Sequence, residues 1–414
     1  MRNSKTRILS VVLLILFVTF SKGLNYVVWD DVVPKEFFYF LYLSIMIYTI
    51  ANFDKSKFKY PLWSFIVCLL LAPLLLAVIR QILGGSGILD NKQFILSTTC
   101  FLLYYIFFIN KVHVEEISNT IIILSLMIFV IQIFQQFFPS KAVFGVYGID
   151  KQSELGYQIA PIRNGLWRFS VPVVFALYSF YFYWAKIQKK MTVSNVLMFA
   201  IFAVSIYLRM NRLTIVACVI TLALSVFMRN KDRSLLRIIV ISLAIALLLA
   251  TYSSQLFGEM VRDTQSDLDS DYIRVVAYNF FGEKIFASLG TFLFGYGYLE
   301  QVEAWKEIGL FTSDIGFVGE CFTYGILWIV LYVTLVYTLL VKYKAQIPLY
   351  IRLFVISTTI SSIMVFPYRN GAEYILWASI LYISSKSVIK HRLKHEILNH
   401  NSSIQKKVSI RSNR

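Results

Sequence analysis

A series of long apolar runs, separated by short polar connections, constrains the fold of this chain more than any other feature. About 20 helical residues cross the roughly 30 Å hydrocarbon core of a membrane. With 58% hydrophobic and 15% charged residues, a soluble globule would leave too much apolar area facing water. We therefore predict an all-α polytopic membrane protein with about twelve transmembrane helices. The runs cover about residues 8 to 29, 37 to 53, 61 to 83, 94 to 110, 117 to 138, 168 to 185, 193 to 208, 213 to 228, 235 to 251, 311 to 341, 349 to 367 and 371 to 389.

The charges of the connections predict the orientation. If the N terminus is inside, the inner segments, such as NFDKSKFK, AKIQKK and the tail from Lys386, carry a large excess of Lys and Arg over Asp and Glu. Cytoplasmic loops have this bias, so we predict that both termini are cytoplasmic. The net charge of +17 then reflects topology, and we expect no nucleic-acid partner. The basic tail is expected to rest on anionic lipid or to lack a fixed structure.

The longest polar stretch sets the domain organisation. Residues 1–250 are predicted to form transmembrane helices 1–9 with an outer loop at 139–167, and residues 251–310 a large extracytoplasmic loop. Residues 311–389 then form helices 10–12, and residues 390–414 a basic cytoplasmic tail. Within the large loop, Asp269 or Ser270 is predicted to cap a helix that Gly290 terminates. The segment LEQVEAWKEIG is predicted to form a second, amphipathic helix along the membrane surface.

The outer segments are rich in arginine, which the charge bias does not explain. The planar guanidinium group binds two phosphate oxygens at once, whereas lysine offers a point charge. Any single one of these arginines could simply reach lipid phosphates at the interface. Only the eight outer arginines taken together therefore indicate a ligand. A shared anionic ligand on the outer face explains the set best. Its members are Arg80, Arg163, Arg168, Arg209, Arg212, Arg262, Arg274 and Arg369.

A general base on this outer face would have to be a carboxylate, because all four histidines are predicted to lie inside. The candidates are Asp314, Glu320, Glu373, Asp271 and Asp150. Carboxylates near the mouths of spans, such as Glu320 and Glu373, are costly to bury and are therefore functional candidates. The expected role of Glu373, however, is to pair with Arg369. The cysteines lack metal-ligand spacing, and the alternating aspartates near residue 270 lack the glycine and glutamate of a calcium loop. Neither a metal nor a cofactor is expected.

Several outer segments resemble a known family when their order and spacing are taken together. IAPIRNGLWRFSVPVVFAL places Arg163 and Arg168 before a span, and NRLTIVACVITLAL places Arg212 at the start of the next. IRVVAYNFFGEKIFASLGTFLFGYGY combines Arg274 with Gly295 and Gly297. In these segments the chain is similar to the bacterial O-antigen and capsular polysaccharide polymerase and ligase superfamily. Its members are integral-membrane enzymes of the C-type glycosyltransferase kind that use undecaprenyl-diphosphate-linked sugars.

The resemblance implies a membrane glycosyltransferase in the bacterial cytoplasmic (inner) membrane. It would polymerise lipid-linked oligosaccharide repeat units into O-antigen or capsule, with donor, acceptor and membrane lipids as partners and a chain-length regulator protein as a further candidate. Arg274, Arg212, Asp314 and Glu320 are the expected catalytic residues. The expected substrate-binding residues are Arg163, Arg168, Arg209, Arg80, Arg369, Tyr278, Gly295 and Gly297.

Two other functions stay open. A ligase would transfer finished polymer to an acceptor, but where ligases carry a His-Asn pair this chain has Ser313 and Asp314. A flippase for lipid-linked oligosaccharides could also use many spans and phosphate-binding arginines. Transporters, however, typically show internal repeats and ionisable sites near the bilayer midplane, and this sequence shows neither pattern.

Overall fold

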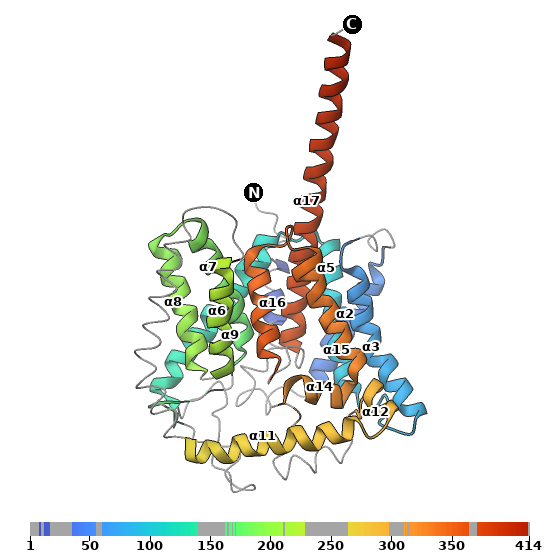
Figure 1. Cartoon of the computed structure of the whole chain (residues 1–414), viewed down its shortest axis with the longest axis vertical. Helices are drawn as coiled ribbons and strands as arrows, with labels where there is room; N and C mark the ends of the chain where they lie inside the picture. Colours follow the sequence, from blue (N-terminus) through green and yellow to red (C-terminus); the bar gives the residue numbers. More distant parts are fainter. Residues whose placement is uncertain are drawn as a thin grey trace.

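The helices of the computed structural model form an upright bundle, and one helix, α11, lies across one end of it (Figure 1). The described residues are 8–9, 12–16, 35–54, 60–139, 162–163, 165–167, 169, 171–209, 212–227, 264–297, 310, 312, 315–363 and 371–412.

The described elements follow the apolar runs closely, and short loops connect most neighbours. A two-residue antiparallel pair joins β1 to β2, with Arg163 opposite Leu166. The elements are α2 (Lys35–Ala51), α3 (Trp63–Ile82), α4 (Lys92–Ser97), η2 (Thr98–Leu102), α5 (Leu103–Ile109), α6 (Val114–Phe137), β1 (Ile162–Arg163), β2 (Leu166–Trp167), α7 (Val173–Lys189), α8 (Val193–Leu208), α9 (Arg212–Phe227), α11 (Thr264–Ile285), α12 (Leu289–Phe294), α14 (Gly316–Tyr324), α15 (Ile326–Tyr337), η5 (Thr338–Lys342), α16 (Leu349–Ser361) and α17 (Gly371–Ser412).

The described part of the chain is mostly helical, as predicted. Within it, α3 and α6 are long and apolar enough to cross a membrane. Shorter apolar helical segments, of 10–17 residues, cover Phe37–Ala51, Phe94–Ile109, Val193–Leu208, Leu213–Ser225, Ile326–Lys342 and Leu349–Ser361. The run at 235–251 and most of the run at 8–29 lie outside the described residues, so the number of twelve spans stays a prediction.

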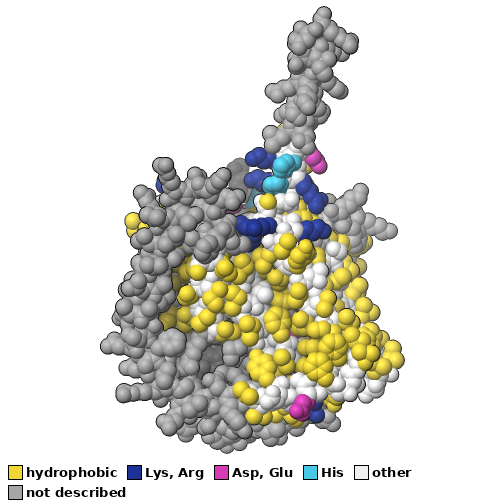
Figure 2. Space-filling model, in the orientation of Figure 1, with side chains coloured by type: hydrophobic (Ala, Val, Ile, Leu, Met, Phe, Trp, Pro, Cys, Tyr) yellow, Lys and Arg dark blue, Asp and Glu magenta, His cyan; other side chains and the backbone are white. Residues whose placement is uncertain are grey.

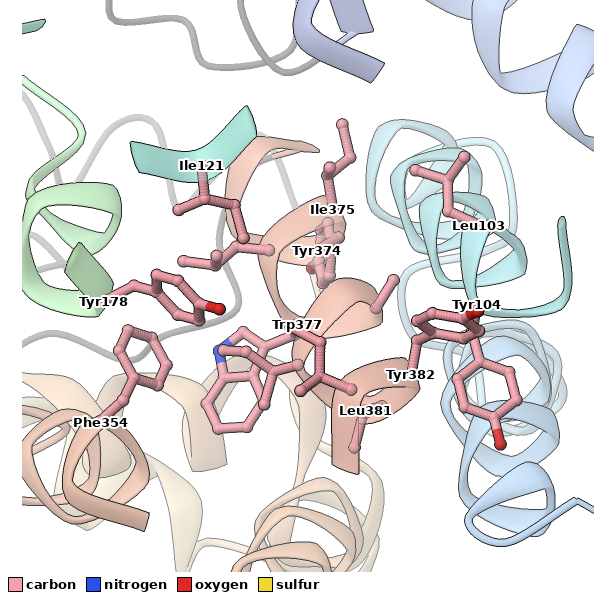
Figure 3. Packing of buried hydrophobic residues seen from close by; sticks show 14 of the residues in the cluster. Leu103, Tyr104, Ile121, Tyr178, Phe354, Tyr374, Ile375, Trp377, Leu381 and Tyr382 are labelled. Carbon is pink, nitrogen blue, oxygen red and sulfur yellow. The ribbon is translucent and has the colours of Figure 1, made fainter. Parts of the chain in front are cut away.

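The first half of α17 forms the centre of the bundle. Tyr374, Trp377 and Tyr382 on this helix are almost completely buried. In Figure 3 they lie between Phe354 of α16 on one side and Tyr104 of α5 on the other. The Trp377 and Phe354 rings are 5.8 Å apart, in the edge-to-face arrangement that aromatic pairs favour. A helix that is apolar on all sides suits this central position.

A line of buried polar side chains on α6 joins this helix to its neighbours. Ser118, Ser125 and Gln132 recur every seven residues, so they share one face of the helix. Ser125 Oγ lies 2.8 Å from Ser179 Oγ of α7, and Gln132 accepts a 2.5 Å hydrogen bond from Ser205 Oγ of α8. Hydrogen bonds between helices inside an apolar bundle fix their rotation and register.

The helix α11 starts and ends at different residues from those predicted. It begins at Thr264, before Asp269 and Ser270, and ends at Ile285. Gly290 does not stop it, because Ser288 starts a new helix, α12, through a capping box with Thr291. A serine side chain that accepts from the N3 amide is a strong helix start, and Gly290 therefore lies inside the first turn of α12.

The predicted span at 311–341 is not one helix. Gly325 has a φ of +83° and separates α14 from α15. A Cβ atom on this residue would lie 2.2 Å from the Leu293 carbonyl oxygen. Because residue 325 has no side chain, the end of α12 can lie against the junction between α14 and α15. An uninterrupted helix with a side chain at this position would keep the two segments apart.

The helix α17 continues through the basic tail to Ser412 and leaves the bundle at the end opposite α11 (Figure 1). The tail was expected to rest on anionic lipid or to lack a fixed structure, and the second alternative was wrong. Residues 372–412 contain neither glycine nor proline, so nothing in the sequence breaks the helix. Figure 2 shows basic and histidine side chains gathered where α17 leaves the bundle, beside a broad apolar band. The segment 299–309, predicted to form an amphipathic helix, lies outside the described residues.

Candidate functional site

The predicted site residues fall into three groups. The structure describes Gly295 and Gly297 in full, and it describes the side chains of Arg80, Arg209, Tyr278 and Glu320. It describes the backbone alone for Arg163 in β1, Arg212 at the start of α9 and Arg274 in α11. Arg168, Asp314 and Arg369 lie outside the described residues.

Arg80 lies in the last turn of α3 and is 3% exposed. Its Nη1 atom donates to the carbonyl oxygens of Phe294, at 2.9 Å, and Thr323, at 3.3 Å. One guanidinium group therefore joins three elements: α3, the end of α12 and the end of α14. The Nε and Nη2 atoms of the same side chain are buried and make no hydrogen bond within the described structure.

The segment from Gly295 to Gly297 pairs with the end of α14 in an extended manner. The amide of Tyr296 donates to the Phe322 oxygen at 2.6 Å, and the amide of Gly297 donates to the Thr323 oxygen at 2.9 Å. Both glycines have φ values near +77°. A Cβ on Gly295 would lie 2.5 Å from the Thr323 oxygen, and one on Gly297 would lie 1.7 Å from Ser86 Oγ. The Gly-x-Gly pattern thus has a backbone-packing role in this structure.

The glycine-rich turn after α3 completes this corner. Ser86 is 1% exposed, and its hydroxyl donates to the Tyr296 oxygen at 3.2 Å. Asn91 donates from Nδ2 to Ser86 Oγ, at 3.3 Å, and to the Gly87 oxygen, at 2.7 Å. The turn is therefore tied both to itself and to the segment that covers Arg80.

Arg209 occupies a different part of the same bundle end. It follows α8, is half-buried, and donates from Nη1 to the Val171 oxygen just before α7. Nearby, Gln136 at the end of α6 exchanges two 2.9 Å hydrogen bonds with the backbone of Trp167 in β2. These bonds hold the hairpin that carries Arg163 against α6.

The helix α11 spans the distance between these two corners. In Figure 1 one end of α11 lies below α8 and α9, and the other end leads into α12. Its 22 residues correspond to a length of about 33 Å. Arg80 at the end of α3 and Arg209 after α8 therefore do not meet at one point.

A small second core fixes α11 to the bundle. Ala277, Phe281 and Ile285 lie on one face and are buried against α14, and the Phe281 ring is 4.7 Å from that of Phe322. Tyr278, half-buried, donates from its hydroxyl to the Ile363 oxygen at the end of α16. Arg274 lies one turn before Tyr278 on the same helix.

Glu320 lies on α14 and is 4% exposed. Thr323, whose carbonyl oxygen accepts a hydrogen bond from Arg80, follows Glu320 by three residues. The start of α14 packs on the end of α16, where the Phe317 amide donates to the Ser362 oxygen at 3.1 Å. A buried carboxylate is thus held in the region between α11, α16 and the Arg80 corner.

Sequence reasoning missed Ser86, Asn91 and the carbonyl groups of Phe294 and Thr323. The GGSG turn that follows Arg80 was a usable signal for Ser86, because glycine-rich turns allow close backbone approach. The two carbonyl partners lie more than 200 residues away along the chain, and no local pattern identifies them.

The described residues contain no group of three or more histidine, cysteine, aspartate or glutamate side chains that could hold a metal ion. The available chemistry within them is that of guanidinium groups, hydroxyls, backbone amides and a buried carboxylate. Such groups bind anions and orient hydroxyl groups. In comparisons with known proteins, no protein-family model and no curated protein matches the chain.

Proposed function

We propose that this chain is a multi-pass protein of the bacterial cytoplasmic membrane, with about twelve spans and both termini in the cytoplasm. Support comes from exposed apolar side chains around the bundle, among them Leu75, Val130 and Val333, each more than half exposed. A soluble monomer seldom exposes so much contiguous apolar surface. The apolar band in Figure 2, beside the basic side chains at the base of the projecting helix, fits the same interpretation.

Within this class we propose a polysaccharide polymerase that joins undecaprenyl-diphosphate-linked oligosaccharide repeat units into O-antigen or capsule on the outer face of the membrane. One observation carries the proposal. The helix that bears Arg274 crosses the bundle end to which α3, the β1–β2 hairpin, α8 and α9 each contribute an arginine (Figure 1). A row of arginine-bearing elements of this length suits two lipid-linked substrates, each with a diphosphate.

The proposed reaction transfers a glycan from one lipid carrier to another. A hydroxyl oxygen of the acceptor sugar forms a bond to the anomeric carbon of the donor, and the bond from that carbon to the diphosphate oxygen breaks. The undecaprenyl diphosphate leaves with the bonding electrons. Arg163, Arg168, Arg212 and Arg274 stabilise the growing negative charge, because preorganised donors act most strongly on charge that develops in the transition state. Asp314 or Glu320 accepts the hydroxyl proton.

Alanine substitutions test the arginine assignment. In cells that depend on this protein for surface polysaccharide, Arg274→Ala and Arg212→Ala are expected to lower polymerisation about 100- to 1,000-fold, the effect of removing one transition-state donor. Polymer length on gels measures the result. Lys284→Ala removes a cation from the same helix α11, where Lys284 lies over the Phe280 ring, and serves as the matched control. Long polymer in both arginine variants would exclude the diphosphate clamp.

A ligase and a lipid-linked oligosaccharide flippase are the alternatives. A ligase needs a second acceptor, a lipid or a protein, and would give no polymer from repeat units alone. A flippase would move repeat units across a bilayer without a new glycosidic bond. The broken helix at Gly325 resembles a transporter feature, but here it lies at the bundle end, beside α12, and serves backbone pairing.

A further inference from the structure

The guanidinium group of Arg80 is a buried cation, and the described residues offer it no counter-ion. Arg80 is 3% exposed, and within the described structure it forms no ion pair with a carboxylate. Its two hydrogen-bond acceptors are neutral carbonyl oxygens on Phe294 and Thr323. An uncompensated charge inside a protein is strongly unfavourable unless a partner charge or several hydrogen bonds offset it. Among the described residues, nothing supplies an anion to the corner around Arg80.

The unused donors of Arg80 have a specific geometry. Nε and Nη2 lie on one edge of the planar guanidinium group, and their N–H bonds along that edge are parallel. Both atoms are buried and have no hydrogen-bond partner in the part of the chain that the structure describes, whereas Nη1 makes both observed bonds. Two parallel N–H groups match two oxygen atoms of a phosphate or carboxylate. The free edge is thus the one that binds an oxyanion in a bidentate manner.

The surroundings of this edge add small polar groups and glycine backbone. An ideal Cβ on Gly297 would lie 3.0 Å from Arg80 Nε and 1.7 Å from Ser86 Oγ, so glycine leaves the two side chains close to the backbone. Ser86 adds a hydroxyl, and the turn Gly84–Gly87 brings three glycines to the same place. Sites for phosphate groups commonly combine these features.

We propose that Arg80, through Nε and Nη2, forms a binding site, the seat, for one phosphate-type oxyanion. Ser86 becomes a second donor when its hydroxyl is released from the Tyr296 oxygen. The proposal rests on the function proposed above, since the donor and acceptor lipids each carry a diphosphate. Anionic phospholipid headgroups offer the same chemistry from a second source. The segment Gly295–Gly297 covers the seat, so it moves aside when the anion enters. It is held to α14 by the backbone bonds of Tyr296 and Gly297.

Binding of inorganic diphosphate to the full chain in phosphate-free detergent tests the seat, for example by titration calorimetry. Wild-type protein is expected to bind it, and Arg80→Lys, which keeps the charge but loses the fork, to bind at least tenfold more weakly. Lys92→Gln removes an exposed cation from the adjacent α4 and is expected to leave the dissociation constant within twofold. The proposal is overturned if wild-type protein does not bind diphosphate. It is also overturned if wild type and Arg80→Lys have equal dissociation constants for diphosphate.

A second arm identifies the source of the anion. Native mass spectrometry of protein extracted from phosphatidylglycerol nanodiscs counts retained lipids, and a lipid retained by wild type but lost in Arg80→Lys assigns the seat to a headgroup. Hydrogen exchange at the Tyr296 and Gly297 amides is expected to increase when the anion binds, and unchanged exchange contradicts entry through this segment. Polymer formation is scored separately. A protein that polymerises but shows no anion at Arg80 refutes the seat alone, and one that binds diphosphate without polymerising refutes the polymerase alone.

Discussion

Two glycines with nearly the same φ differ in how closely other backbone atoms surround them. Gly84 has a φ of +79° and Gly295 a φ of +77°. A Cβ on Gly84 would meet nothing within 4 Å, whereas one on Gly295 would lie 2.5 Å from backbone atoms of Thr323 and Gly325. The positive φ strains an alanine at either position, and Gly295, with a ψ of 175°, lies in a region that is essentially restricted to glycine. Only at Gly295 must the backbone of another element also move.

We therefore expect Gly295→Ala to destabilise the protein clearly more than Gly84→Ala. The thermal melting temperature of the purified protein in detergent measures the effect. Gly84→Ala is expected to shift it slightly, from strain alone, and Gly295→Ala by several degrees more. Equal shifts would show that the segment 295–297 does not approach α14 as closely as described.

The residues of the Arg80 corner show which parts of a site a sequence reveals. Arg80 was a ligand-binding candidate because it belongs to the set of arginines in the predicted outer segments. Its burial and its bonds to Phe294 and Thr323 were not, since they depend on contacts between distant segments. Gly295 and Gly297 were predicted from the resemblance to bind substrate, and their close packing against Ser86 and Thr323 had no local signal.

At the scale of elements, α11 depends on a small core of its own. Phe281 is completely buried and lies against Phe322 of α14, while Val275 on the same helix is 56% exposed. The apolar runs predicted most bundle helices to within a few residues. They did not reveal the starts and stops set by local bonds, such as the capping box of Ser288 or the break at Gly325.

Removing the Phe281 ring is expected to loosen α11 from the bundle. A buried Phe→Ala change costs about 3–5 kcal/mol in well-packed cores, and here the loss falls on one helix. Hydrogen exchange of the peptide covering α11 is expected to become faster in Phe281→Ala and to stay unchanged in Val275→Ala. If both variants exchanged like the wild type, the second core would not be what holds α11.

At the scale of the whole molecule, the two ends of the bundle differ in chemistry. One end carries α11 and the arginine-bearing elements, and the opposite end carries the projecting, basic part of α17 (Figure 1). The charge bias of the loops predicts that these ends face opposite sides of a membrane. The sequence could indicate this polarity because it is summed over many loops, whereas the crossing of α11 over the bundle end required the structure.

Single cysteines test this polarity. In a protein with its four native cysteines replaced, Ala287→Cys lies in the turn between α11 and α12, and Lys190→Cys lies at the end of α7, both at exposed positions. An impermeant maleimide added to intact spheroplasts is expected to label residue 287 and not residue 190. Lysis should make residue 190 reactive. Equal labelling of both before lysis would contradict the orientation.

As proposed above, this protein makes glycosidic bonds between lipid-linked repeat units at its arginine-rich end. Purified protein in liposomes, supplied with radiolabelled undecaprenyl-diphosphate-linked repeat units as the sole substrate, tests it most directly. A ladder of polymers that grows with time is expected in the wild type, and this ladder is expected to be strongly reduced in Arg274→Ala. Translocation of the repeat units across the bilayer, without any product longer than one unit, would contradict it.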